Sequence, residues 1–203
     1  MTYLTEKSPP EQVAYIAQLM FERNLTDIAG GNVSLRDGDI VYISPRYAGS
    51  KWHWHLDPVD IISGSIETNE LLENPSFSRE GLSHIAVYRS FPMVTGIIHA
   101  HAPNVLPFCS LELPMEPVIR STKKFGVLEY HNHTPEYSQE QADSIVEKLR
   151  GKETMIQESA AAVLMPQHGI FVAGKDIWTA IDSLERINTN AWCIIARKIL
   201  FEN

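Results

Sequence analysis

The sequence is poor in cysteine and has no long apolar run. Its 203 residues include two cysteines, Cys109 and Cys193, which form neither a CxxC pair nor a disulfide framework. No stretch approaches the roughly 18 apolar residues of a membrane-spanning helix. The first residues, MTYLTEKSPPEQ, lack the apolar segment of a secretory signal. We therefore expect a cytoplasmic protein in a reducing compartment, with no membrane partner.

Basic clusters, repeats and low-complexity tracts are also missing. The chain carries 25 acidic against 17 basic side chains, a net charge of −8, and no block of Lys or Arg. Nucleic-acid-binding proteins usually show basic patches, so this charge argues against such a partner. Hydrophobic residues make up 44% of the chain, which is enough for one sizeable core. We expect a single domain over residues 1–203.

Hydrophobic spacing and turn residues predict a mixture of helices and strands. Helices are expected at Pro9–Asn24, Arg79–Ser90 with Ser78 as cap, Asn104–Leu111, Ser138–Arg150 and Ile177–Phe201. Strands are expected at Asn32–Arg36, Ile40–Ser44, Ile61–Ile62, Thr95–Ala100, Ala161–Met165 and Ile170–Ala173, with strand and loop over Glu116–Leu128. Helices and strands do not alternate strictly, so we expect an α/β fold with a mainly antiparallel sheet covered by helices.

Histidine pairs of the form HxH occur three times, as His53/His55, His99/His101 and His131/His133. Spacing alone does not identify a site, because most such pairs are packed or solvated. His99 and His101 differ in context, since they end an apolar strand in GIIHAHAP and would point to one face. His168 lies between two apolar strands in MPQHGIFVAG. Three neutral imidazoles would leave one position of a tetrahedral zinc ion open, which is typical of a catalytic site.

Glu80 is the candidate acid or base. A carboxylate near a helix start is favoured by the helix dipole alone, but beside a metal it is the usual proton carrier. The helix terminus and a dication would lower its pKa while burial would raise it, and the sequence leaves that balance open. His84 lies four residues later on the same helix face, where we expect a packing or supporting role.

Four motifs in this order resemble the class II aldolase/adducin family over nearly the whole chain. They are Gly30-Gly31-Asn32-Val33-Ser34, Ser78-Arg79-Glu80 with His84 and Tyr88, Ile98-His99-Ala100-His101-Ala102, and His168-Gly169 before a long helix. The resemblance implies a three-layer αβα fold with a central, largely antiparallel sheet. It also implies a homotetramer with active sites at subunit interfaces, and zinc on His99, His101 and His168, with manganese or cobalt as alternatives.

The implied activity is that of a zinc-dependent, aldolase-type lyase. It would cleave a small hydroxy-carbonyl compound, a sugar phosphate being one candidate, through a metal-bound enediolate, with Glu80 carrying the proton. A metal-dependent decarboxylase of a hydroxy or keto acid is the second enzyme hypothesis. A non-catalytic, adducin-like assembly module is the alternative from a different class.

A small anionic substrate is expected, and its anion would meet Gly31 and Asn32, whose turn could form an anion-binding nest or simply permit a positive φ. The remaining candidates for substrate binding are Ser44, Arg46, Ser78 and Arg79. Arginine suits a carboxylate as well as a phosphate. Ser44-Pro45-Arg46 and Ser78-Arg79 depart from the family's TPSG-like turn and serine pair, so the anion stays open. So does the second acid, for which Tyr47, Tyr130 and the His131/His133 pair are candidates.

Overall fold

The computed structural model describes residues 6–201 and contains one six-stranded sheet in the order β3-β2-β1-β4-β6-β5. Every neighbouring pair of strands in it is antiparallel. The strands are β1 (Asn32–Asp37), β2 (Ile40–Ile43), β3 (Ile62–Ser65), β4 (Gly96–Ala100), β5 (Ala160–Met165) and β6 (Gly169–Gly174). The predicted α/β fold with an antiparallel sheet is thereby confirmed.

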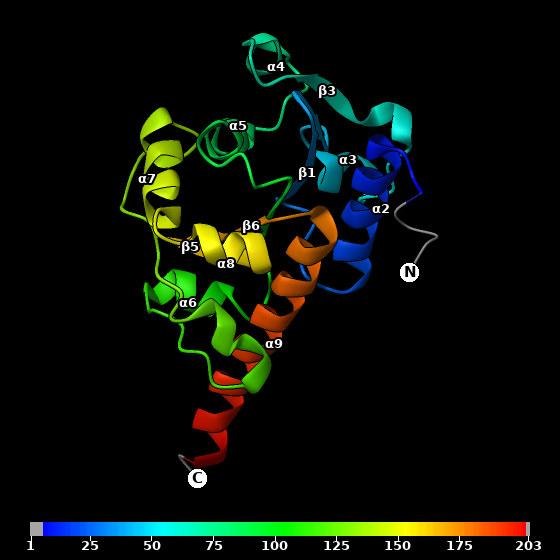
Figure 1. Cartoon of the computed structure of the whole chain (residues 1–203). Coiled ribbons are helices and arrows are strands. Elements are labelled where there is room, and N and C mark those ends of the chain that lie inside the picture. Colours follow the sequence, from blue (N-terminus) through cyan, green and yellow to red (C-terminus); the bar gives the residue numbers. More distant parts are fainter. Residues whose placement is uncertain (1–5, 202–203) are drawn as a thin grey trace.

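Helices cover both faces of this sheet (Figure 1). They are α2 (Pro9–Glu22), α3 (Ala48–Trp52), α4 (Glu70–Glu73), α5 (Gly81–Ser90), α6 (Leu106–Leu111), α7 (Gln139–Leu149), α8 (Glu153–Glu158) and α9 (Ile177–Phe201), with 3-10 turns η1 (Pro58–Asp60) and η2 (Arg120–Phe125). Among residues 6–201, no helix combines the length and apolar character that crossing a bilayer requires.

Side chains alternate between the two faces of the sheet along each strand, so each face has its own apolar core. In β4, Ile98 and Ala100 join the core beneath α2 and α9, while Ile97 joins the core beneath α5, α7 and α8. Successive strand residues point to opposite faces, so His99 falls on the same side as Ile97. The metal candidates are therefore directed toward the layer that contains Glu80 and α5.

Local signals account for several element boundaries. Ser8 and Glu11 form a capping box at the start of α2, and the hairpin of β1 and β2 turns at Gly38 with a φ of +58°. Helix α2 ends at Glu22, before the predicted Asn24, whose φ is +54°. A left-handed residue cannot continue a right-handed helix, which explains the earlier end.

Three details differ from the prediction. Ser78 does not cap α5, which begins at Gly81; its hydroxyl instead accepts a hydrogen bond from the Asn32 amide at 2.9 Å. The segment expected as strand and loop at residues 116–128 contains η2, and only an isolated bridge between Met115 and Leu128 pairs it. Helices α3, α4 and α8 are additional, and each is too short to show clear apolar periodicity.

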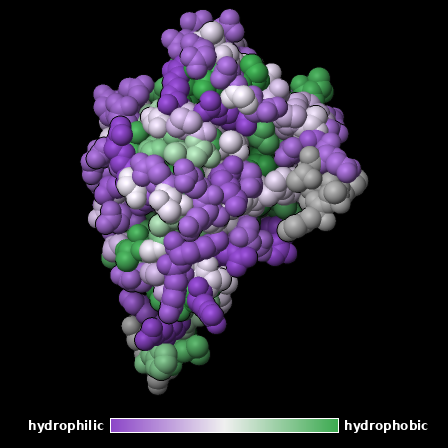
Figure 2. All heavy atoms as spheres, viewed as in Figure 1, coloured by the Kyte–Doolittle hydropathy of each residue, from purple (hydrophilic) through white to green (hydrophobic). Residues whose placement is uncertain are grey.

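An apolar surface lies where α6 and the end of α9 meet. Exposed fractions reach 67% for Leu111, 77% for Leu200 and 79% for Phe201. Two adjoining grooves share Ile194 and Lys198, one running toward Leu111 and the other toward Phe201. We call Leu111, Ile194, Leu200 and Phe201 the apolar tip, and hydrophobic spheres gather at the lower end of Figure 2 where α9 ends.

Candidate active site

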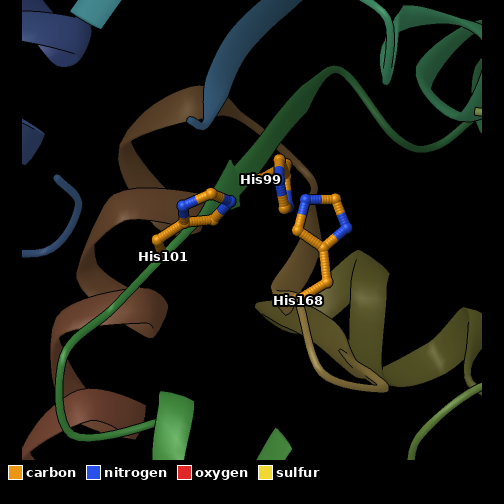
Figure 3. A group of neighbouring side chains, drawn as sticks. All are labelled: His99, His101 and His168. Carbon is orange, nitrogen blue, oxygen red and sulfur yellow. The ribbon is translucent and has the colours of Figure 1, made fainter. Parts of the chain in front are cut away.

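Three histidines from distant parts of the chain converge at the end of the sheet. His99 is the last residue but one of β4, His101 directly follows this strand, and His168 lies in the turn between β5 and β6 (Figure 3). One nitrogen from each ring lies within 4.8 Å of the others. The ring centroids are 5.3 Å, 4.8 Å and 5.1 Å apart. The structure therefore brings together the three side chains that the sequence suggested.

Close backbone packing holds this arrangement. β4 pairs with β6, with His99 opposite Phe171, so the turn that contains His168 is fixed against the end of β4. A Cβ atom on Gly169 would lie 2.5 Å from the Ala100 carbonyl oxygen. Only glycine permits that approach, which gives the His168-Gly169 motif a structural reason.

Hydrogen bonding selects which ring nitrogens can bind a cation. The Nδ1–H of His99 donates to the Ile170 carbonyl at 3.2 Å, and Nδ1 of His101 lies 3.3 Å from Asp27 Oδ1. The His99 hydrogen bond places its proton on Nδ1, and the Asp27 carboxylate favours the same tautomer of His101, so that Nε2 of each ring carries a free lone pair. The His101 Nε2 atom is buried with no hydrogen-bond partner among the described residues. A buried polar atom without a partner is costly, and a cation at the centre would satisfy it.

Burial keeps the imidazoles of His99 and His168 uncharged. It holds the pKa of His99 well below its usual range, with the neighbouring His168 and His101 adding to the effect. Burial, and then His101, lowers the pKa of His168 to about 4. Neutral imidazole is the form that binds a metal. The donor set thus fits a divalent cation such as zinc, with three nitrogen ligands and space for a fourth.

Glu80 lies beside these rings with 3% of its surface exposed. Its Oε1 atom is 3.7 Å from Nδ1 of His168, and the side-chain amide of Gln141 donates to its two oxygens at 3.3 Å and 3.2 Å. Burial raises the pKa of Glu80 to about 7, although the Gln141 amide opposes that rise. Burial therefore outweighs the charge effects that the sequence left in balance, for the residues of this chain alone.

One pocket unites the histidines, Glu80 and most of the predicted substrate contacts. Its walls contain Gly31, Asn32, Arg46, Ser78 and Arg79. Asn32 Oδ1 and Arg46 Nε are buried and lack hydrogen-bond partners within residues 6–201. Unpartnered polar atoms beside an open cavity are available to a bound ligand.

Ser44 does not line that pocket. It is fully buried, and its hydroxyl accepts a hydrogen bond from the Val33 N–H at 3.1 Å. This contact ties β1 to the chain after β2. This geometry gives no support to the predicted role of Ser44 in substrate binding, because its position close to Arg46 in sequence does not put both side chains on one surface.

Three residues of the site were not found by sequence reasoning. Asp27 supports His101, Gln141 contacts Glu80, and Tyr137 lines the pocket with its ring centroid 6.1 Å from that of His168. The Arg79 guanidinium lies 4.3 Å from the Tyr137 ring centroid. No local motif marks Asp27 or Gln141, because their contacts join segments far apart in the chain.

The other two HxH pairs serve as internal controls, and neither joins the cluster. His131 is buried with Nδ1 on the Asn132 carbonyl, and the exposed His133 contacts Glu112 at 2.9 Å. Of the candidates for a second acid, Tyr47 lines the pocket, whereas Tyr130, His131 and His133 do not. Neither His53 nor His55 belongs to a group of three metal-ligating side chains in the described part of the chain.

His84 has the supporting role that its helix position suggested. It is fully buried, its Nδ1 atom lies 2.7 Å from the Ser34 hydroxyl, and that hydroxyl lies 2.8 Å from the Tyr88 hydroxyl. Burial lowers the pKa of His84 to about 3, so it packs as a neutral ring. The Ser34–His84–Tyr88 contacts attach α5, and hence Glu80, to β1.

The antiparallel sheet with helices on both faces carries a pocket lined by three histidines and a carboxylate, which are the residue types of a catalytic metal site. The profile of the Class II Aldolase and Adducin N-terminal domain matches residues 11–195, and the chain belongs to this family. A non-catalytic assembly module is thus not supported, because the relatives are named as enzymes.

Two relatives and one solved structure illustrate the range. An L-fuculose phosphate aldolase of Methanococcus maripaludis strain S2 is 27% identical over 169 residues, 81% of this chain and 84% of that protein. A 3-oxo-tetronate 4-phosphate decarboxylase of Haemophilus influenzae is 26% identical over 200 residues, 93% of this chain and 87% of that protein. The structure of an L-fuculose 1-phosphate aldolase superimposes with a TM-score of 0.82 at 18% identity, covering 99% and 91% of the two chains, which shows the fold.

Proposed function

We propose that this enzyme is a zinc-dependent lyase that breaks a carbon–carbon bond in a small, anionic hydroxy-carbonyl compound. The observation that carries the proposal is the convergence of His99, His101 and His168 around a pocket, with ligand nitrogens within 4.8 Å of one another and the Nε2 atom of His101 unpartnered. Manganese or cobalt could fill the same nitrogen site.

In the proposed reaction the histidines bind the metal and Glu80 transfers a proton. The three imidazoles would hold the cation, which supplies a Lewis acid that stabilises negative charge on a substrate oxygen. Glu80 carries a proton to or from the reacting carbon or hydroxyl. In the metal-free chain burial raises its pKa to about 7, and a bound dication would lower that value, which favours the carboxylate form that accepts a proton.

Anion recognition is assigned to one end of the pocket. Gly31, Asn32, Ser78, Arg46 and Arg79 line it. The Arg46 Nε–H has no partner in the described residues and could donate to a phosphate or carboxylate oxygen. Both curated relatives described above are named for phosphorylated substrates, which favours a phosphate.

Decarboxylation is the second candidate reaction. It is favoured by the Haemophilus influenzae relative, whose similarity spans 93% of this chain. Aldol cleavage needs an acid for the leaving aldehyde oxygen, and Tyr137 and Tyr47 are the tyrosines that line the pocket. Replacing each of them by phenylalanine would therefore help to separate the two reactions.

Assembly and location belong to the same proposal. We propose a homotetramer with active sites near subunit interfaces, supported by the exposed apolar tip and by Tyr47, a residue of the pocket wall that is 47% exposed. A cytoplasmic location is supported by two free cysteines that form no disulfide.

The test combines metal analysis with two assays. The purified full chain should hold about one zinc per chain and should release either an aldehyde from L-fuculose 1-phosphate or carbon dioxide from 3-oxo-tetronate 4-phosphate. Glu80→Gln should lower kcat by about 100-fold or more with the metal retained, since general acid–base catalysis contributes that much. Glu140→Gln, an exposed helix-start carboxylate outside the pocket, is the matched control.

Two results would contradict the proposal. One is a zinc-supplemented protein that binds no metal. The other is a Glu80→Gln variant with unchanged turnover on the substrate that the wild type cleaves.

A further inference from the structure

Asp27 stands directly behind one of the three imidazoles. Its Oδ1 atom is 3.3 Å from Nδ1 of His101, on the opposite side of the ring from the unpartnered Nε2. Asp27 itself does not line the pocket, although the next residues, from Ile28 onward, do. It is therefore placed to act on the cation through His101 and not on the substrate.

The same carboxylate oxygen also builds the turn that lines the anion end of the pocket. Oδ1 of Asp27 accepts the backbone N–H groups of Ala29 at 2.8 Å and Gly30 at 3.1 Å. The carbonyl of Asp27 accepts from the indole N–H of Trp54 at 2.8 Å, and Trp54 is fully buried. The carboxylate is thus anchored, although 46% of its side chain is exposed.

The turn at residues 26–30 also packs closely against the His101 ring. A Cβ atom on Gly30 would lie 2.2 Å from Cε1 of His101. The Thr26 hydroxyl donates to the Gly30 carbonyl at 3.0 Å and accepts from the His101 N–H at 3.3 Å. Residues 26–30 therefore contact His101 at its backbone N–H, at its Nδ1 atom and at the edge of its ring.

The other two imidazoles are supported differently. His99 has a neutral partner, the Ile170 carbonyl. The carboxylate nearest His168 Nδ1 is Glu80, which the proposed mechanism uses to carry protons. Within the described chain, Asp27 is the carboxylate that contacts a predicted ligand without a role of its own in the pocket.

We propose that Asp27 is a positioning residue that holds His101 with its proton on Nδ1 and couples the anion-binding turn to the metal site. A carboxylate behind a ligating imidazole fixes the ring orientation and makes the nitrogen a stronger donor. The inference rests on the proposed function, because it concerns the affinity of the same metal centre. Asp27 Oδ1 contacts both the turn and His101. A shift of the turn would therefore move the His101 ring, and a shift of that ring would move the turn.

The experiment measures zinc affinity in the metal-free full chain, by competition with a chromophoric chelator. Asp27→Asn keeps an acceptor oxygen for Ala29 and Gly30 but removes the charge. It should weaken zinc binding by about 10- to 100-fold, the usual effect of losing such a partner. The absorption bands of bound Co²⁺ should shift as well. Unfolding of the metal-free protein should match that of the wild type.

Two control variants separate positioning from loop structure. Asp39→Asn removes an equal charge from the β1–β2 turn, far in the fold from the histidines, and should leave zinc affinity unchanged. Thr26→Val removes the hydroxyl contacts of the same loop without altering charge. It should weaken zinc binding by less than Asp27→Asn, because the Nδ1 contact remains.

The outcomes are distinguishable. If Asp27→Asn binds zinc within twofold of the wild type, or no more weakly than Thr26→Val, the positioning role is overturned while the proposed function stands. If the wild type itself binds no zinc, the proposed function fails, and this inference fails with it. A loss of zinc affinity that is larger in Asp27→Asn than in Thr26→Val and absent in Asp39→Asn supports the proposal.

Discussion

Glu80, His84 and His99 are titratable side chains placed where the surrounding protein largely excludes water. Burial raises the pKa of Glu80 to about 7 and lowers that of His84 to about 3. In each case the uncharged form is favoured, because a charge in a low-dielectric interior is costly. His84 and His99 are therefore neutral rings, and a neutral imidazole ligand would not offset the charge of a bound cation.

The raised pKa of Glu80 predicts a pH dependence of stability in the metal-free protein. The unfolded-state value is near 4.5. The stability that comes from the protonated carboxyl is fully present below that pH and is lost as pH rises through about 7. Relative to Glu80→Gln, the wild type should lose roughly 3 kcal/mol across this window, taking 1.36 kcal/mol for each pKa unit.

Chemical denaturation of both metal-free proteins between pH 4 and pH 8 would measure this difference. Glu140→Gln, which removes an exposed carboxylate, should follow the wild type. Parallel stability curves for the wild type and Glu80→Gln would show that Glu80 is not buried as described.

At the scale of elements, α7 supplies the partner of the candidate acid. The Ser138 hydroxyl caps this helix by accepting from the Gln141 N–H at 3.1 Å. The Gln141 amide then reaches Glu80, and its Oε1 atom accepts from the Tyr137 N–H at 2.5 Å. The first turn of α7 thereby sets the position of Tyr137 and the proton affinity of Glu80 together.

Gln141→Met should shift the pH–rate profile. The amide donates to the carboxylate form and lowers the pKa of Glu80, so its loss raises that pKa. If Glu80 must be unprotonated to react, the acidic limb of the kcat profile should move up by about one to two pH units, given about 1.5–3 kcal/mol for a hydrogen bond to a charged group.

Gln139→Met is the matched control, because Gln139 contacts Asp143 on the exposed side of the same helix. Its profile should coincide with that of the wild type. An unshifted acidic limb in Gln141→Met would mean that a group other than Glu80 controls the rate.

At the scale of the whole molecule, the apolar tip is the feature that one chain leaves unexplained. Leu200 and Phe201 are more than three-quarters exposed at the end of a 25-residue helix whose buried residues all lie between Ile177 and Ala191. Contiguous exposed apolar surface usually marks a contact with another protein. The homotetramer proposed above would cover it.

Replacing Leu200 and Phe201 together by aspartate should reduce the assembly. Two buried charges at an interface are costly, so the mass measured by light scattering should fall from four copies of the 22.9-kDa chain to fewer. Val59→Asp is the matched control, since Val59 is 89% exposed in η1. An unchanged mass in the Leu200/Phe201 variant would place the subunit contact elsewhere.

The sequence by itself determined the elements with strong local patterns. The Ser8 capping box, the hairpin at Gly38 and the apolar stripe of α9 depend on neighbours within a few residues, so their structures follow from composition and spacing. The same holds for the pairing of His99 with His101 on one strand face. Their link to His168 and Glu80 was predicted from the apolar strands around His168, from the helix start at Glu80 and from the order of family motifs.

Only the tertiary structure decided which of the candidate side chains face one another. Ser44 and Ser78 were both candidates for substrate binding from the sequence. The Ser44 hydroxyl accepts a hydrogen bond from β1, whereas Ser78 lines the pocket. Asp27 and Gln141 carry no local signal, because each acts across a contact with a residue more than 60 positions away. The protonation of Glu80 was likewise undetermined, since burial is a property of everything packed around a residue and not of its neighbours in the chain.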